Sequence, residues 1–321
     1  MKRLITLAIA IAMAMAAAAP AQAQDYPNRP IRLVTLGTPG TASDVLVRTV
    51  GKRLSEKLGQ PVVVDNKPGA DGVIAAADVA KAAPDGYTLL FASNSPIAAA
   101  PALRKSLPYD PIVDLTPITM VGYFTFFLYL NADVPAKTLQ ELVAYAKANP
   151  GKLSYGSGNT TGSVGVAQIA ALTDTQMVHV PYKGEPQAIV DLLAGRIDMM
   201  IGTPTTGLSH VRSGKLRALV TTLKQRSTIL PDVPTIYEAG LPQFTITSWG
   251  GMFGPAKMPK EIVARLNKVL IEVIQEPEVV KTLEAQGFAL ATSTPEELGS
   301  YLKGQIEAWK VSARAAGIEP E

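Results

Sequence analysis

Short apolar runs alternate with helical segments along most of the chain, and this alternation limits the fold more than any other feature. Residues 31–36 (IRLVTL) form an apolar run that is typical of a buried strand. The helix predicted after it, from about Ser43, carries a leucine or valine at every fourth position, which places these side chains on one face. Strands alternating with helices of about 10–15 residues indicate βαβ units, so the sequence predicts an α/β fold with mostly parallel sheets. Further strands are predicted at residues 62–64, 88–92, 153–155, 177–180, 197–201 and 216–221.

Two extended aromatic stretches divide the chain into two α/β lobes. Residues 123–130 (YFTFFLYL) and 245–253 (TITSWGGMF) are predicted to cross from one lobe to the other. The first lobe is then discontinuous, made of residues 24–123 plus 249–321, and residues 124–248 form the second lobe. Two lobes joined by two hinge strands enclose a cleft, and ligands of open α/β sheets bind outside the carboxyl ends of the strands.

The first 23 residues are predicted to be a secretory signal peptide. Lys2 and Arg3 precede an uncharged stretch over residues 4–19, and Ala21-Gln22-Ala23 matches a cleavage site, with cleavage after Ala23. The apolar stretch is shorter than the ~20 residues of a membrane span. The chain has no cysteine that could carry a lipid. We therefore expect a soluble exported protein, located in a Gram-negative periplasm.

Composition and motifs argue against nucleic-acid binding, cysteine chemistry, metal sites and dinucleotide binding. The 30 Lys and Arg residues nearly balance the 27 Asp and Glu residues and form no cluster, so no nucleic-acid partner is expected. The absence of cysteine excludes thiol catalysis, disulfides and iron–sulfur ligation. His179 and His210 lie at no metal-ligand spacing, so each is interpreted as a structural or surface histidine, and no metal or cofactor is expected. Residues 156–162 miss the dinucleotide-binding fingerprint because Thr161 replaces its third glycine.

Two polar loops that end a strand and open a helix are the strongest functional signal. Residues 37–44 (GTPGTASD) and 156–163 (GSGNTTGS) combine glycines, which allow close approach to a ligand, with the free N–H groups of a helix N-terminus, which favour an anion. The alternative is that Ser43, Thr161 or Ser163 only caps its own helix. Asp44 is expected to support the first loop. Tyr182 and Lys183 are also expected as supporting residues of the site, and the alternative for Lys183 is a surface or turn residue. The candidate ligand-binding residues are Gly37, Thr38, Gly40, Thr41, Ala42, Ser43, Ser93, Asn94, Ser157, Asn159, Thr160, Thr161, Ser163, Gly202 and Thr203.

An ordered set of short strings along residues 26–240 resembles the Bug family, the periplasmic solute-binding receptors of tripartite tricarboxylate transporters. The resemblance implies a type II periplasmic-binding-protein fold that closes on a small-molecule carboxylate and delivers it to the membrane subunits of such a transporter. It also implies that the two polar loops hold one carboxylate, through backbone groups and ordered water. The strings are residues 26–31 (YPNRPI), 65–69 (DNKPG), 82–89 (AAPDGYTL), 107–111 (LPYDP), 148–153 (ANPGKL), 179–184 (HVPYKG), 214–218 (GKLRA) and 230–240 (LPDVPTIYEAG).

Two departures from that family bear on the ligand. Gly37 stands where relatives often have a phenylalanine, and Gly202 stands where they often have an acid. If the site has lost this bulk and charge, a larger dicarboxylate is expected, possibly an aromatic one such as terephthalate. The alternative is that neighbouring side chains refill the space and leave a site for small dicarboxylates.

Three functions are compatible with this reading of the chain. The leading one is a binding protein without catalysis, expected to be a monomer. A ligand-presenting accessory of a two-component sensor would need the same closed, liganded form. A secreted enzyme on the same architecture would need a nucleophile–base pair or a metal cluster, and the sequence motifs indicate neither.

Overall fold

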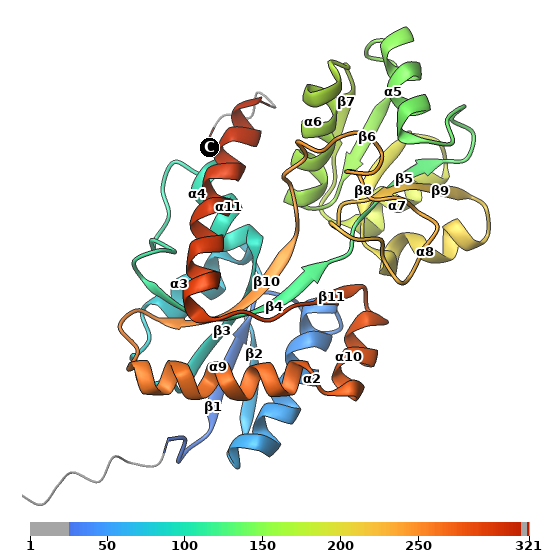
Figure 1. The fold of residues 1–321 in the computed structure, drawn as a ribbon. Helices are drawn as coiled ribbons and strands as arrows, with labels where there is room; N and C mark the ends of the chain where they lie inside the picture. Colours follow the sequence, from blue (N-terminus) through green and yellow to red (C-terminus); the bar gives the residue numbers. More distant parts are fainter. Residues whose placement is uncertain (1–25, 316–319, 321) are drawn as a thin grey trace, which may run out of the picture.

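The structure, a computed structural model, describes residues 26–315 and residue 320, and it contains two sheets (Figure 1). The signal peptide predicted for residues 1–23 lies outside the described residues. The first sheet has six strands in the order β11-β4-β10-β3-β1-β2, and the second has five in the order β7-β6-β8-β5-β9. The strands of the first sheet are β1 (Ile31–Thr35), β2 (Val62–Asn66), β3 (Thr88–Ser93), β4 (Leu115–Phe124), β10 (Trp249–Pro255) and β11 (Phe288–Leu290). Those of the second are β5 (Phe127–Asn131), β6 (Ser154–Ser157), β7 (Val178–Pro181), β8 (Met199–Gly202) and β9 (Leu216–Thr221).

Helices cover both faces of the first sheet because its strands alternate buried side chains between the two faces. Ile31 and Leu33 belong to one buried cluster with side chains of three of these helices, whereas Val34 belongs to another. The helices of the first cluster are α2 (Ala42–Leu58), α9 (Lys260–Ile274) and α10 (Pro277–Glu284). The other face carries α3 (Val73–Ala80), the π-helical turn η2 (Ser95–Ala99), α4 (Ala100–Leu103) and α11 (Pro295–Ala315), with the 3-10 turn η1 (Ala70–Gly72) before α3. The second sheet has α5 (Leu139–Ala148), α6 (Thr160–Thr173), α7 (Glu185–Leu193) and α8 (Pro204–Arg212).

The prediction of mostly parallel sheets is wrong, because both sheets are mixed. Strands β1, β2 and β3 are parallel to one another, and so are β6, β7 and β8. Strand β10 is antiparallel to β3 and β4, β11 is antiparallel to β4, and β5 is antiparallel to β8 and β9. The reversed strands β5 and β10 are those that receive the chain from the other sheet. Each of them enters its sheet at the end where the parallel strands finish.

This arrangement turns the carboxyl ends of the parallel strands in both sheets toward the hinge. Phe127, the first residue of β5 after the crossing, pairs with Gly202, the last residue of β8. In the first sheet, Gly250 near the start of β10 pairs with Ser93, the last residue of β3. The loops that follow β1, β3, β6 and β8 therefore all lie on the hinge side of their sheets, which is where open α/β sheets bind ligands.

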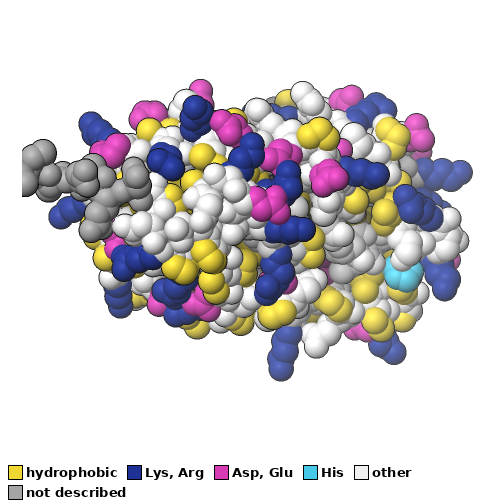
Figure 2. Space-filling model, turned by 90° about the horizontal axis from the view of Figure 1, so that it is seen from below, with side chains coloured by type: hydrophobic (Ala, Val, Ile, Leu, Met, Phe, Trp, Pro, Cys, Tyr) yellow, Lys and Arg dark blue, Asp and Glu magenta, His cyan; other side chains and the backbone are white. Residues whose placement is uncertain are grey.

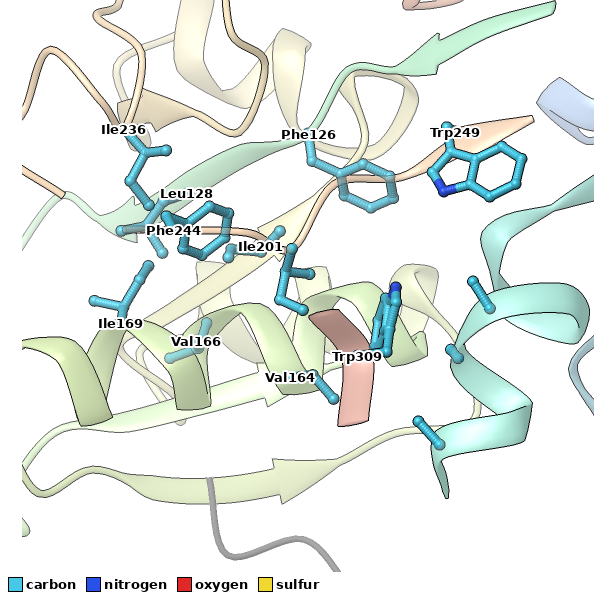
Figure 3. Close-up of a cluster of buried hydrophobic side chains, with 14 of the residues drawn as sticks. Phe126, Leu128, Val164, Val166, Ile169, Ile201, Ile236, Phe244, Trp249 and Trp309 are labelled. Atoms are coloured by element: carbon cyan, nitrogen blue, oxygen red, sulfur yellow. The ribbon is translucent and has the colours of Figure 1, made fainter. Parts of the chain in front are cut away.

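A single buried cluster continues through the hinge. Phe126 and Trp249, from the two crossings, lie with Val164 of α6 and Trp309 of α11 (Figure 3). Trp249 and Trp309 are fully buried.

The surface and the helix lengths bear on other possible partners. On the face shown in Figure 2, Lys and Arg side chains lie among Asp and Glu side chains, so this face carries no basic patch. Within the described residues, no helix combines the length and the apolar character of a membrane span.

Candidate ligand-binding site

The first polar loop connects β1 to α2, and its outer residues are exposed. Thr38, Pro39, Gly40 and Thr41 face solvent. Thr41 caps α2, because its hydroxyl accepts a hydrogen bond from the Asp44 N–H at 3.4 Å while donating to the Thr38 carbonyl at 2.8 Å. Gly40 has φ +85°, and the space in front of its Cα is open. The loop thus presents bare backbone at the N-terminus of a 17-residue helix.

Asp44 holds this loop in shape from beneath. Its carboxylate is buried and accepts hydrogen bonds from the Gly40 N–H and the Arg48 guanidinium, both at 2.9 Å. The Asn66 amide donates to Asp44 Oδ1 at 2.8 Å and to the Gly37 carbonyl at 2.7 Å. Asn66, at the end of β2, ties the loop to the neighbouring strand, a role that the sequence alone does not reveal. The Arg48 guanidinium and the other donors lower the pKa of Asp44 to about 2.

A pH-dependent stabilisation follows from this carboxylate. Because its pKa is lower in the folded protein than the usual 3.8, the stabilisation is present above pH 3.8 and is lost as the pH falls toward about 2. We expect Asp44→Asn to lower the free energy of unfolding at pH 7 by ~1–2 kcal/mol, since Arg48 is half exposed and its charge is screened. Urea unfolding at pH 7 and at pH 3 measures this.

The control is Asp71→Asn, which changes an exposed carboxylate of the same lobe. Equal losses in the two variants, or an Asp44→Asn loss that does not shrink at acid pH, would contradict the role given to Asp44.

The second polar loop, between β6 and α6, is closed by its own side chains. Asn159 caps α6 by accepting a hydrogen bond from the Gly162 N–H at 2.7 Å, and the Ser163 hydroxyl donates to the Thr160 carbonyl at 3.1 Å. The caps of the two helices are therefore Thr41 and Asn159, and the alternative that Ser43, Thr161 or Ser163 caps its helix is wrong.

Ser157 is paired with a histidine. Its buried hydroxyl lies 2.6 Å from Nε2 of His179, whose ring stacks on Tyr155 with centroids 4.8 Å apart. Partial burial lowers the pKa of His179, which favours the neutral form of the ring. Within the described part of the chain, no ion pair joins this histidine to an Asp or Glu. The pair satisfies a histidine that the sequence analysis interprets as structural.

Glu185 is the main feature of the site that sequence reasoning missed. Its carboxylate accepts hydrogen bonds from Asn159 Nδ2 at 2.6 Å, from the Thr203 N–H at 2.9 Å, and from the hydroxyls of Thr203 and Thr206 at 2.7 and 2.8 Å. It therefore connects the second loop to the loop after β8. In the sequence, an acid in the first turn of a helix indicates only compensation of the helix dipole, so the local pattern carries no sign of these contacts.

Neighbouring side chains lie close to Gly37 and Gly202, the two positions at which a loss of bulk and charge is expected. A Cβ on Gly37 would lie 2.5 Å from Thr41 Oγ1 and 3.2 Å from Ser43 Cβ, so neighbouring side chains already fill that space. At Gly202 the Glu185 carboxylate and Thr206 each lie 3.5 Å from where a Cβ would stand. Glu185 thus supplies, from another strand–helix unit, the acid that Gly202 lacks, and the alternative that side chains refill the space is the one the geometry favours.

The remaining predicted site residues differ in their position and burial. Ala42 and Ser43 lie in the first turn of α2, and Thr160 and Thr161 in the first turn of α6, with Thr161 buried. Ser93 and Asn94 are buried, and Asn94 Oδ1 accepts a hydrogen bond from Ser248 at 2.9 Å.

The other two residues expected to support the site have different environments. The Tyr182 hydroxyl donates to Asp191 at 2.8 Å, whereas Lys183 is exposed. Among the described residues, no group of three acidic or histidine side chains is placed to hold a metal ion.

Comparison with known proteins decides the family. The family described as "Tripartite tricarboxylate transporter family receptor" (TctC) matches residues 46–318. The chain belongs to this receptor family. The receptor is 38% identical over 298 residues to BugT of Bordetella pertussis, an alignment that covers 92% of this chain and 91% of BugT.

Solved structures agree with the receptor's fold. It superposes on Rpa4515 of R. palustris, solved with adipate, with a TM-score of 0.81 and 31% identity, covering 92% of this chain and 100% of the other. For MatC of Rhodopseudomonas palustris, solved with bound malate, the TM-score is 0.74 at 29% identity, covering 89% and 99%. The receptor therefore has the two-lobed periplasmic-binding-protein fold, as the sequence predicts.

Proposed function

We propose that this receptor works in the periplasm, where it captures a dicarboxylate between its lobes by hinge closure and delivers it to the membrane subunits of a tripartite tricarboxylate-type transporter. The observation that carries the proposal is the pair of polar loops, one in each sheet, that follow strands whose carboxyl ends face the hinge. Both loops lack Lys and Arg, and both open a helix of 14 or more residues. Neutral donors of this kind bind an anion without a fixed countercharge. The proposal takes residues 24–123 plus 249–321 and residues 124–248 as the lobes that close.

The geometry favours an open-chain dicarboxylate over terephthalate. Gly37 and Gly202 add no room for a ring, because Thr41, Ser43 and Glu185 occupy the space beside them. Adipate in Rpa4515 and malate in MatC, both flexible diacids, support the same choice by analogy. Asn159 and Thr203 donate to Glu185, so the contacts we assign to the ligand come mainly from backbone N–H groups of the first loop and of the α6 N-terminus.

Titration calorimetry with matched acids and amides tests this proposal. We expect succinate, malate or adipate to bind, and the corresponding diamides to bind at least tenfold more weakly. A ligand at 100 times its Kd should also stabilise the receptor by ~2.7 kcal/mol, which is visible as a rise in Tm. Diamides that bind as tightly as the acids would refute an anion site. If terephthalate binds tightly and the aliphatic diacids do not bind, the preference for an open-chain ligand is refuted.

Gly40→Val tests whether the first loop contacts the ligand. The substitution puts a β-branched residue at φ +85°, which only glycine adopts easily, and projects its side chain into the open space in front of the loop. We expect the affinity for the diacid to fall at least tenfold, or ~1.4 kcal/mol, as measured by calorimetry.

Gly214→Val is the matched control for Gly40→Val. Gly214 has φ +75° and the same open surroundings, but it lies in the turn between α8 and β9. Equal affinity in the Gly40 variant and its control would mean that this loop does not touch the ligand.

A further inference from the structure

A cavity of about 770 Å³ lies beside the hinge. None of the residues that line it belongs to the two polar loops. Leu223 and Tyr237 come from the segment that follows β9 of the second sheet, whereas Phe288 of β11 and Gln305 of α11 come from the C-terminal block. Its size is that of cavities that hold small organic molecules.

The walls suit an aromatic ring. Tyr123 of β4 and Tyr301 of α11 meet edge to face, with ring centroids 6.3 Å apart and planes at 88°. Phe288, Tyr237 and Phe244 also line the cavity. Aromatic rings arranged in this way prefer a further ring in an offset or edge-to-face position, so the surface favours a flat, unsaturated ligand over a flexible chain.

The charges along the cavity wall favour a neutral ligand. The charges along the lining offset each other: Lys224 faces the same cavity as Glu284, and Arg226 pairs with Glu238 at 3.0 Å. An acid of the kind proposed for the cleft would therefore gain no net electrostatic attraction here.

The second crossing separates this cavity from the candidate site. Thr245 and Thr247 line the cavity, whereas the next residue, Ser248, donates its hydroxyl to Asn94 at the end of β3. Because the cavity walls come from both lobes, any rotation about the hinge changes the distance between them. A molecule that fills the cavity therefore favours one hinge angle and must alter the affinity of the cleft by linkage.

We propose that the hinge cavity is an effector site for a neutral aromatic molecule. Ligand binding in this cavity is inferred from its own lining residues, and only the coupling of the cavity to the cleft rests on the proposed function.

The binding test uses 4-hydroxybenzamide, a neutral probe that offers no anion to the polar loops. Trp249 packs edge to face on Tyr301 of the cavity wall, with centroids 5.2 Å apart, so we expect the probe to change tryptophan fluorescence saturably. Ala308→Phe fills the cavity and should abolish this change. Val311→Phe, at an exposed position of the same helix, should leave it intact. No saturable change in the wild-type protein, or a change that survives Ala308→Phe in the folded variant, overturns the proposal.

Tyr237→Leu keeps the test decisive if Ala308→Phe does not fold. It removes one aromatic ring of the cavity wall at a half-buried position, so the fold should persist while the affinity for the probe falls about tenfold. Calorimetry with adipate at saturating probe then measures the coupling, for which we expect at least a threefold change in Kd. An unchanged Kd overturns the effector role, whereas failure of every diacid to bind refutes the proposed function and leaves the fluorescence result standing.

Discussion

Gly158→Ala should abolish diacid binding and lower the free energy of unfolding by ~3 kcal/mol, a cost typical of an overpacked interior position. A Cβ at residue 158 would overlap with the backbone of Gly184 and Glu185, and backbone atoms cannot rotate away as a flexible side chain can. The second loop would be forced apart from the start of α7, and Glu185 would lose its position between the loops. Urea unfolding and calorimetry of the variant measure the two effects.

Gly184→Ala is the matched control for this prediction. Gly184 belongs to the same contact, but a Cβ there would meet only Pro186 Cδ at an ordinary 3.6 Å, and its φ of −176° is extended backbone that any residue adopts. We expect this variant to have the same free energy of unfolding as the wild-type protein and the same affinity for diacids. If Gly158→Ala behaves in the same way, the close packing of the loop against α7 has no role in the site.

Much of the fold is predictable because its signals are local. The apolar run over residues 216–221 predicts a strand, and β9 covers Leu216–Thr221. The direction of the strands is not local: β5 and β10 run antiparallel to their neighbours because the chain enters each sheet from the hinge, and no period in the sequence records that. The approximate start of a helix is predictable, but its capping residue is not, because several hydroxyl or amide side chains near the start could cap it. In the structure the caps are Thr41 and Asn159.

In the candidate site, too, local features are predictable from the sequence and contacts between distant segments are not. Glycines and small polar residues after a strand predict an anion-binding loop, because those residue types act through the backbone beside them. Contacts between distant segments escape this reasoning: Asn66 reaches Asp44 from 22 residues away, and Glu185 reaches Thr203 from 18 residues away. The expectation of a widened cleft could not take this into account, since the carboxylate that lies beside Gly202 belongs to another strand–helix unit.

Glu185→Gln is expected to lower the free energy of unfolding by ~2–3 kcal/mol, since hydrogen bonds to a charged group are each worth about 1.5–3 kcal/mol. All four partners of the Glu185 carboxylate donate hydrogen bonds, so the NH₂ group of glutamine must face a donor wherever it points. The comparison is Glu278→Gln, which removes an exposed acid from the first turn of α10 and should cost at most ~0.5 kcal/mol. Urea unfolding of both variants separates the two roles an acid has at a helix start. Equal small losses would mean that Glu185 only compensates the dipole of α7, and the link it makes between the second loop and the loop after β8 would then contribute nothing to stability.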